Sequence, residues 1–301
     1  MATAPAYNCL ICGQNYADVN SYYAPAFSAL PGTNGAQYSP LAPLVNIQNP
    51  ILAFKARTVN CVPADNSFVI DLKTPRSIAA IVIPRHNLDQ NGTFTFSVYT
   101  DAALNQLVGT YTGNVSPIAF PFGTVSFPDP HFWYGNYTAE EFSSHVVPML
   151  AVFNPSVVGR YVVVQPNNPT NAAGYLELSR LVISPGFQPS SNFSYGATLT
   201  PVDPSIITTT LGGFRAADLR PKYREIHVTF QTIDNQTALT QFFDTQFGLG
   251  RTGQLFFAMN PTDSLNLFRT SFLANLKQLD PLTTAYFGYS GVAYSLIEVI
   301  A

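Results

Sequence analysis

The chain has 301 residues, of which 47% are apolar and only 10% are charged, and its formal net charge at pH 7 is -3. An ordinary soluble domain is about 25% charged, so this composition predicts a surface that other subunits partly cover. A chain with 14 Lys and Arg against 17 Asp and Glu lacks the basic face that nucleic-acid binding requires. No apolar run approaches the roughly 18 residues of a membrane span.

Residues 1–45 are rich in Pro, Gly, Ala and Tyr and show neither helical nor strand periodicity. Their aromatic side chains give them more apolar surface than a solvated tail carries. We therefore expect an extended N-terminal arm that packs on its own domain or on a neighbouring subunit.

Cys9 and Cys12 form a Cys-x-x-Cys pair within this arm, and Cys61 stands alone further along. Three thiolates favour a zinc or iron-sulfur site, with a fourth ligand from His86, His131 or His145. The alternatives are reduced, partly buried cysteines that pack as small hydrophobic residues, or a Cys9–Cys12 disulfide formed after release of the protein. We favour these alternatives over a metal site because a second Cys-x-x-Cys is absent.

Residues 46–185 are predicted to form a β-sandwich, because short β-branched and aromatic runs alternate there with turn residues. Asn91-Gly92 predicts a turn with positive φ before the run at 93–99. In the closing run, Leu176 and Leu178 are expected to face inward, with Glu177 and Arg180 outward. The expected strands are 50–54, 68–72, 78–83, 93–99, 161–164 and 175–183.

Two of these stretches resemble a known family. FVIDLKTPRSIAAIVIPRHNL (68–88) and GRYVVVQPNNPTNAAGYLELSRLVIS (159–184) resemble the opening and closing strands of the discoidin-like (galactose-binding-like) sandwich found in tailed-phage structural proteins. The resemblance implies a fold that hosts sugar binders, lipid binders and inert connectors alike. It also places His86 in a loop, either as a ligand contact or, as we favour, as a hydrogen-bonding anchor.

Residues 114–155 are expected to interrupt the sandwich with an aromatic insertion that contains the only tryptophan, Trp133. Trp133, Tyr134 and Tyr137 could stack on a sugar, with Asp129, Asn136 or Glu140 supplying hydrogen bonds. The same residues could form a satellite core or contact another protein subunit, which we favour. Thr138, with Glu141 three residues later, predicts the start of a short helix.

The sequence predicts no enzyme, and no catalytic residues are assigned. Glu140 and Glu141 are adjacent and cannot face one another as a glycosidase pair. Hydrolase, metalloprotease and phosphate-loop motifs are absent from the sequence.

A second module is expected at 216–301, after a turn-rich linker at 186–215. It begins with an alternating strand at 223–233 that directs Ile226, Val228 and Phe230 inward and His227 outward. Asp234 is expected to cap a helix that ends at Gly248. The apolar face of this helix is Leu239, Phe242, Phe243 and Phe247, and further strands are expected at 255–259, 267–272 and 291–300.

This order of strand, helix, aromatic strand, Pro-x-Asp turn and Phe-Arg-x-x-Phe resembles the tube-like domain of phage distal tail and minor tail proteins. The resemblance implies a sheet that assembles into a ring, with Arg269 as a rim salt-bridge residue. The expected fold is therefore mainly β: a discoidin-like jelly-roll β-sandwich followed by a tail-tube-like β-sandwich or barrel with one helix.

Together these features predict a virion component, made in the host cytoplasm, at the distal tail or baseplate. The expected partners are further copies in a homo-oligomeric ring and the tail tube, hub and tape-measure proteins. The alternative is a carbohydrate-binding module that attaches the tail tip to a host surface glycan.

Overall fold

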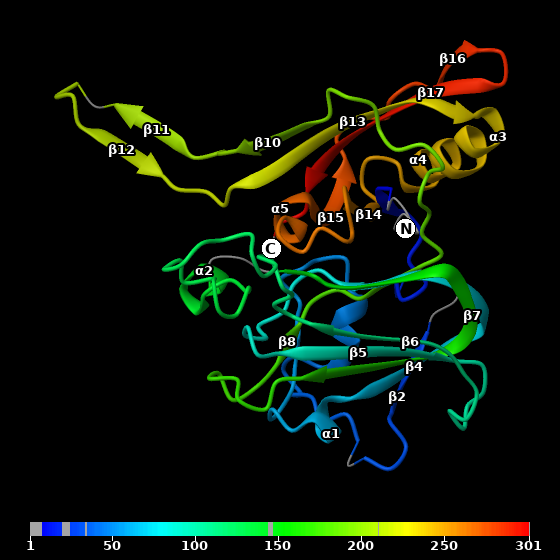
Figure 1. The fold of residues 1–301 in the computed structure, drawn as a ribbon, viewed down its shortest axis with the longest axis vertical. Helices are drawn as coiled ribbons and strands as arrows, with labels where there is room; N and C mark the ends of the chain where they lie inside the picture. Colours follow the sequence, from blue (N-terminus) through cyan, green and yellow to red (C-terminus); the bar gives the residue numbers. More distant parts are fainter. Residues whose placement is uncertain (1–7, 20–24, 34, 144–146, 210, 301) are drawn as a thin grey trace. The chain divides into compact units, whose positions relative to one another are not determined.

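The computed structural model describes residues 8–19, 25–33, 35–143, 147–209 and 211–300. The chain is mainly β, as expected, and its sheets are antiparallel (Figure 1). It divides into two compact units, residues 1–188 with 256–272, and residues 189–255 with 273–301. Among the described residues, no helix is long and apolar enough to cross a bilayer.

The first unit is built on a six-stranded sheet with the order β2-β4-β7-β5-β6, in which β9 also pairs with β4. A separate two-stranded sheet joins β3 to β8, and β1 pairs with β14. The elements of this unit are β1 (Leu10–Cys12), β2 (Ala26–Ala29), η1 (Leu44–Gln48), β3 (Ala56–Arg57), α1 (Pro63–Asn66), β4 (Phe68–Ile83), β5 (Thr93–Tyr99), β6 (Leu107–Asn114), α2 (Ala139–Ser143), β7 (Met149–Asn167), β8 (Glu177–Leu178), β9 (Val182–Ser184), β14 (Gln254–Ala258) and α5 (Leu267–Thr270).

Strands β4 and β7 form the core of this sheet. The continuous apolar run Ile78–Ile83 predicts a strand buried on both faces, and Ile81, Val82 and Ile83 are fully buried. On β5, Phe94, Phe96 and Val98 are buried as their alternation predicts. These strands therefore follow from the local sequence pattern alone.

The second unit contains the sheet β15-β17-β13-β10, with β16 on the side of β17, and a separate hairpin β11–β12. Ile226, Val228 and Phe230 face inward on β13, as predicted. Its elements are β10 (Thr198–Val202), β11 (Ile206–Thr209), β12 (Arg215–Asp218), β13 (Tyr223–Asp234), α3 (Asn235–Thr237), the π-helical η2 (Ala238–Phe243), α4 (Asp244–Leu249), β15 (Ser271–Leu276), β16 (Thr283–Tyr286) and β17 (Tyr289–Glu298).

Helix starts were predicted better than helix ends. The Asp234 side chain accepts a hydrogen bond from the Thr237 N–H at 2.9 Å and caps α3. Thr138 and Glu141 form a reciprocal capping box at α2. The helical segment that begins at α3 ends with α4 at Leu249, one residue past the predicted end at Gly248, and Gly250 follows with a φ of 56°.

Two segments in which no strands were predicted, the extended N-terminal arm and the linker, form strands. The N-terminal arm contributes β1 and β2, which pair with β14 and β4 inside the first unit. The predicted linker 186–215 contains β10 and β11, because its Thr and Ile residues outweigh the flanking prolines. Local sequence patterns missed these strands, because their pairing partners lie far away in the sequence.

Several strand predictions in the first unit are corrected. Residues 50–54 form a turn rather than a strand. The run 175–183 is divided into β8 and β9, because Ser179 and Leu181 donate backbone hydrogen bonds to Arg85 and Ile47 instead. Arg180 is consequently buried, not outward, and pairs with Asp18.

Two further corrections concern turns. Gly92 does not have the predicted positive φ. A glycine is favoured at this position for a different reason: a Cβ atom added to Gly92 would lie only 3.0 Å from the Cβ atom of Leu88. Residues 267–270 form the short helix α5 rather than the start of a strand, because the Asn266 carbonyl accepts the N–H groups of Arg269 and Thr270.

Gly159 provides a test of the β4–β7–β5 packing. A Cβ added at Gly159 would collide with the Val98 Cγ1 atom and lie 3.0 Å from the Tyr99 carbonyl oxygen. We expect Gly159→Ala to lower the free energy of unfolding by about 1–3 kcal/mol, measured by calorimetry. The control is Gly248→Ala in α4, where nothing lies within 4 Å; it should be neutral or stabilise by up to about 1 kcal/mol. An unchanged melting temperature for Gly159→Ala would contradict this packing.

Candidate functional site

The aromatic insertion lies between β6 and β7 and covers residues 115–148, since 149–155 belong to β7. Trp133 is 72% exposed and Tyr134 is 83% exposed. Phe122 and Phe127 are also exposed, and both contact the half-buried ring of Phe132. The Trp133 ring also contacts Phe132, and Tyr134 follows it in the sequence. The insertion therefore presents a group of aromatic side chains, which we call the aromatic tip (Phe122, Phe127, Phe132, Trp133 and Tyr134).

Tyr137 does not belong to this exposed group, contrary to its predicted place beside Trp133 and Tyr134. Its ring is buried between Phe120 and Phe268, and its hydroxyl donates to the Leu265 carbonyl at 2.6 Å. The Arg269 guanidinium also donates to the Tyr137 hydroxyl. Tyr137 thus anchors the insertion to residues 265–269 of the same unit.

His131 holds the base of the aromatic tip through two carboxylates. Its Nδ1 lies 2.6 Å from Asp129 Oδ1 and its Nε2 lies 2.8 Å from Glu141 Oε2. Both nitrogens can donate at once only in the imidazolium form. These hydrogen bonds raise the pKa of His131 and lower that of Glu141 to about 2. Glu141 also caps α2, so one protonated ring joins the tip to this helix.

The second unit exposes two apolar surfaces, which the sequence analysis did not identify. The hairpin β11–β12 carries exposed Ile207, Leu211, Phe214 and Leu219. On the helical segment 235–249, only Phe242 of the four expected inward residues is buried; Leu239, Phe243 and Phe247 are exposed. The correction has a simple cause: Phe242 alone reaches Phe230 and Tyr294 on the sheet.

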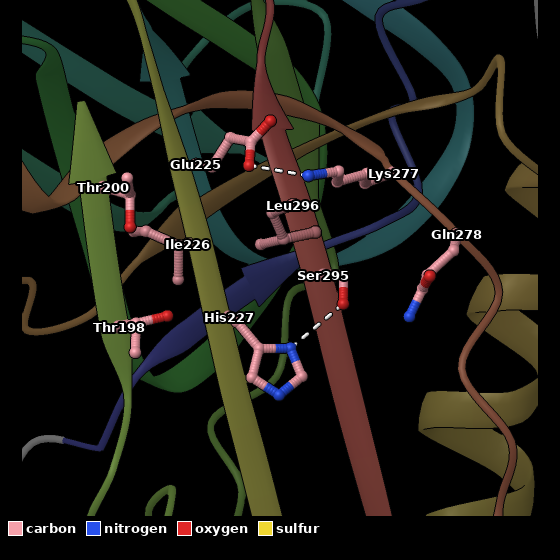
Figure 2. Close-up of a pocket in the computed structure, with 9 residues that line it drawn as sticks. All are labelled: Thr198, Thr200, Glu225, Ile226, His227, Lys277, Gln278, Ser295 and Leu296. Carbon is pink, nitrogen blue, oxygen red and sulfur yellow. Dashed lines mark hydrogen bonds and ion pairs between the residues drawn. The ribbon is translucent and has the colours of Figure 1, made fainter. Parts of the chain in front are cut away.

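A polar pocket of about 240 Å³ lies on the sheet of the second unit (Figure 2). Glu225 and Lys277 form an ion pair of 2.8 Å at one end of it. At the other end His227 Nδ1 lies 3.0 Å from Ser295 Oγ. The lining residues are Thr198, Thr200, Glu225, Ile226, His227, Lys277, Gln278, Ser295 and Leu296.

The chemistry of this pocket does not match nucleophilic catalysis. The Ser295 hydroxyl donates to Asp280 Oδ2 at 2.9 Å, so it accepts from His227. In a catalytic triad the imidazole lies between the carboxylate and the hydroxyl and takes the hydroxyl proton. In this pocket the Ser295 hydroxyl lies between Asp280 and His227. This arrangement orients His227 and does not activate Ser295 as a nucleophile.

His86 is held by two hydrogen bonds in its loop. Its Nε2 lies 2.8 Å from the Val147 carbonyl oxygen, and its Nδ1 accepts from the Leu88 N–H at 3.2 Å. Burial lowers the pKa of His86 to about 4. With both ring nitrogens engaged by backbone, His86 has the geometry of a loop anchor.

No disulfide joins Cys9, Cys12 or Cys61 in the part of the chain that the structure describes. Cys12 is the last residue of β1 and Cys9 directly precedes this strand. Both side chains are buried, and burial raises the pKa of both thiols to about 12. Cys61 is half-buried. Within the described ranges, Cys9, Cys12 and Cys61 do not form a group with metal-ligand geometry, and His145 lies outside those ranges. Burial without charge is the environment in which a cysteine packs as a small hydrophobic residue.

No protein-family model and no curated protein matches this chain. Similar solved structures include a family 32 CBM of Clostridium perfringens NanJ in complex with galactose, at 11% identity and a TM-score of 0.32, covering 53% of this chain and 92% of that one. A Streptococcus pneumoniae fucose binding module has 11% identity and a TM-score of 0.34, covering 57% and 94%. The lectin domain of lectinolysin complexed with Lewis B antigen has 12% identity and a TM-score of 0.34, covering 59% and 98%.

These similarities extend over about half of the chain and are distant. Because the TM-scores lie below 0.5, the ligands of those proteins do not carry over to this chain. A functional assignment has to come from the surfaces described above.

The pairing of His131 with two carboxylates predicts a pH-dependent insertion. A histidine whose pKa is raised on folding contributes stability that is complete below its unfolded pKa of about 6.5 and is lost as the pH rises through the folded value. We expect the emission of Trp133 to change as the pH is raised from about 6 to about 9. In His131→Gln this transition should be missing, and a flat wild-type profile would contradict the imidazolium assignment.

Proposed function

We propose that this chain is a structural subunit of a tailed-phage virion, located at the distal tail or baseplate, which assembles into a ring and connects the tail tube to the tail tip. The observation that carries the proposal is the amount of exposed apolar surface on a chain that is only 10% charged. Seven of the exposed large apolar side chains of the second unit lie on or beside the hairpin β11–β12 and on the helical segment 235–249: Ile207, Leu211, Phe214, Leu219, Leu239, Phe243 and Phe247.

The magnitudes favour assembly. Full burial of a large apolar side chain contributes about 1.5–3 kcal/mol of favourable free energy. Association costs about 4–15 kcal/mol, because the partners lose translational and rotational freedom. Burial of most of these seven side chains would therefore offset the cost of association. A single exposed leucine needs no such explanation, but two clusters on one small unit do.

The specific place in a virion is supported by the two sequence resemblances, one in each half of the chain. Low charge also suits a ring, since each added copy brings little electrostatic repulsion. The polar pocket and the buried thiols provide no competing catalytic chemistry.

Deletion of the reading frame tests this assignment. Mass spectrometry should find the protein in wild-type particles, and electron microscopy should show missing or unfinished tails without it, because the subunit contributes contacts that other tail proteins need. Normal particles that still infect would contradict the proposal. Particles that assemble normally but no longer adsorb to the host would instead indicate that the protein serves host attachment through the aromatic tip.

A second candidate function is recognition of a host surface glycan by the aromatic tip. Trp133 and Tyr134 are 72% and 83% exposed, and an exposed ring can stack on the apolar face of a sugar. This function is compatible with the first, because it uses a different surface.

Trp133 emission provides the corresponding test. We expect host surface glycan to shift the emission of the full-length protein, and Trp133→Ala to abolish binding measured by calorimetry, because the stacking surface is removed. Tyr195→Ala, which removes an exposed ring outside the tip, is the control and should bind as the wild type does. Equal binding by Trp133→Ala and wild type would exclude the tip as the glycan site.

A further inference from the structure

We infer that the polar pocket on the sheet of the second unit binds one uncharged saccharide unit (Figure 2). This inference goes beyond the proposed role in assembly, because it concerns polar residues of the sheet rather than exposed apolar side chains. It is also separate from glycan recognition by the aromatic tip, which belongs to the first unit.

The polar groups of the pocket come from three neighbouring strands in register. Thr198 of β10 pairs with His227 of β13, which in turn pairs with Ser295 of β17. Thr200 pairs with Glu225 two residues further along β10 and β13. Side chains two residues apart on a strand are separated by roughly 6–7 Å, so the polar groups form two rows at that separation. A sugar ring with its hydroxyl groups has a comparable width and can contact both rows.

Both ends of the pocket are held by contacts within the second unit. The Glu225–Lys277 ion pair at one end is 2.8 Å long. At the other end Ser295 is only 8% exposed, and its hydroxyl donates to Asp280 and accepts from His227. A ligand therefore meets polar groups whose positions are already set, which lowers the entropic cost of binding.

Between these ends, hydroxyl and carboxylate groups are available to a ligand. Thr198 and Thr200 are exposed, and among the described residues no hydrogen bond engages either hydroxyl. Each hydroxyl can both donate and accept. The ion pair with Lys277 uses Oε2 of Glu225, so Oε1 of the same carboxylate can accept from a ligand. This mixture of donors and acceptors matches the hydroxyl groups of a sugar.

The charge of the pocket favours an uncharged ligand. The charges of Glu225 and Lys277 cancel, and no other lining residue among those described carries a permanent charge. A charged ligand would compete with Glu225 or Lys277 for its partner and break the ion pair. A sugar hydroxyl can instead donate to the carboxylate or accept from the ammonium group while the pair stays intact, and such charge-assisted hydrogen bonds are strong.

The lining also favours a saccharide over an aromatic ligand. Among the described residues that line the pocket, none is phenylalanine, tyrosine or tryptophan. The pocket therefore offers hydrogen bonds in place of a stacking surface. A flat aromatic ligand would cover the lining hydroxyl and charged groups without pairing them, which costs free energy. The volume of about 240 Å³ accommodates a single sugar unit.

Nuclear magnetic resonance of the His227 ring tests the inference on the full-length protein. The uncharged probes are glucose, galactose and N-acetylglucosamine, and the charged probes are acetate and glycine. At least one of the three saccharides should shift the His227 ring signals in a saturable way, because His227 lines the pocket. Acetate and glycine should leave these signals unchanged. His227→Gln identifies them among the signals of the four histidines.

Matched threonine variants locate the bound saccharide. The double variant Thr198→Val and Thr200→Val removes two hydroxyls and keeps the β-branched shape that strands favour. Its saccharide affinity should be lower by about tenfold or more, because hydrogen bonds to both hydroxyls are lost. Thr209→Val changes an exposed threonine on β11 outside the pocket and should bind as the wild type does.

Other outcomes overturn the inference. The absence of a saturable shift with all three saccharides would reject it. A shift that acetate or glycine produces equally would assign the pocket to a charged ligand instead. Unchanged affinity in the threonine double variant would place the saccharide outside the pocket. Loss of the His227 shift in Trp133→Ala would assign saccharide binding to the aromatic tip.

Discussion

The pairing of β4 with β7 is the constraint on which the first unit depends. Strands β2, β5 and β9 all bond to one of these two, and β6 is attached through β5. Gly159 lies on β7 where Val98 and Tyr99 of β5 leave no space for a side chain. The same sheet holds both ends of the aromatic insertion, since β6 ends at Asn114 and β7 begins at Met149. A closely packed sheet thus supports a long segment that contributes little to its core.

Apolar side chains are used differently in the two units. In the insertion, the buried Tyr137 and the His131 ion pairs support an exposed aromatic tip. In the second unit the sheet buries one side of the helical segment and leaves the other side exposed. A chain with few charged residues that displays such surfaces gains free energy when a partner covers them. This requirement links the composition to the proposed role in assembly.

Features fixed by neighbouring residues could be predicted from the sequence. The buried run Ile78–Ile83, the capping box of Thr138 and Glu141 and the Asp234 cap each depend on residues within one turn or one strand. Burial of Arg180 depends on Asp18, which lies 162 residues away. The division of β8 from β9 likewise depends on carbonyl groups distant in sequence.

The candidate surfaces were only partly predictable. The aromatic content of the insertion identified Trp133 and Tyr134, but which rings turn inward depends on contacts such as that of Tyr137 with Phe268. Most of the hairpin β11–β12 lies in the predicted linker 186–215, because the prediction followed the turn residues of that stretch. The four apolar residues of the helical segment suggested a single inward face, whereas the π-helical stretch and the sheet position admit only Phe242.

The central claim is that the exposed apolar surface of the second unit is an assembly surface. Cryo-electron microscopy of the wild-type oligomer would test it most directly. The account predicts repeated contacts in which the hairpin side chains and the Phe243–Phe247 pair are buried against a neighbouring copy. Oligomers in which both surfaces remain open to solvent would contradict it.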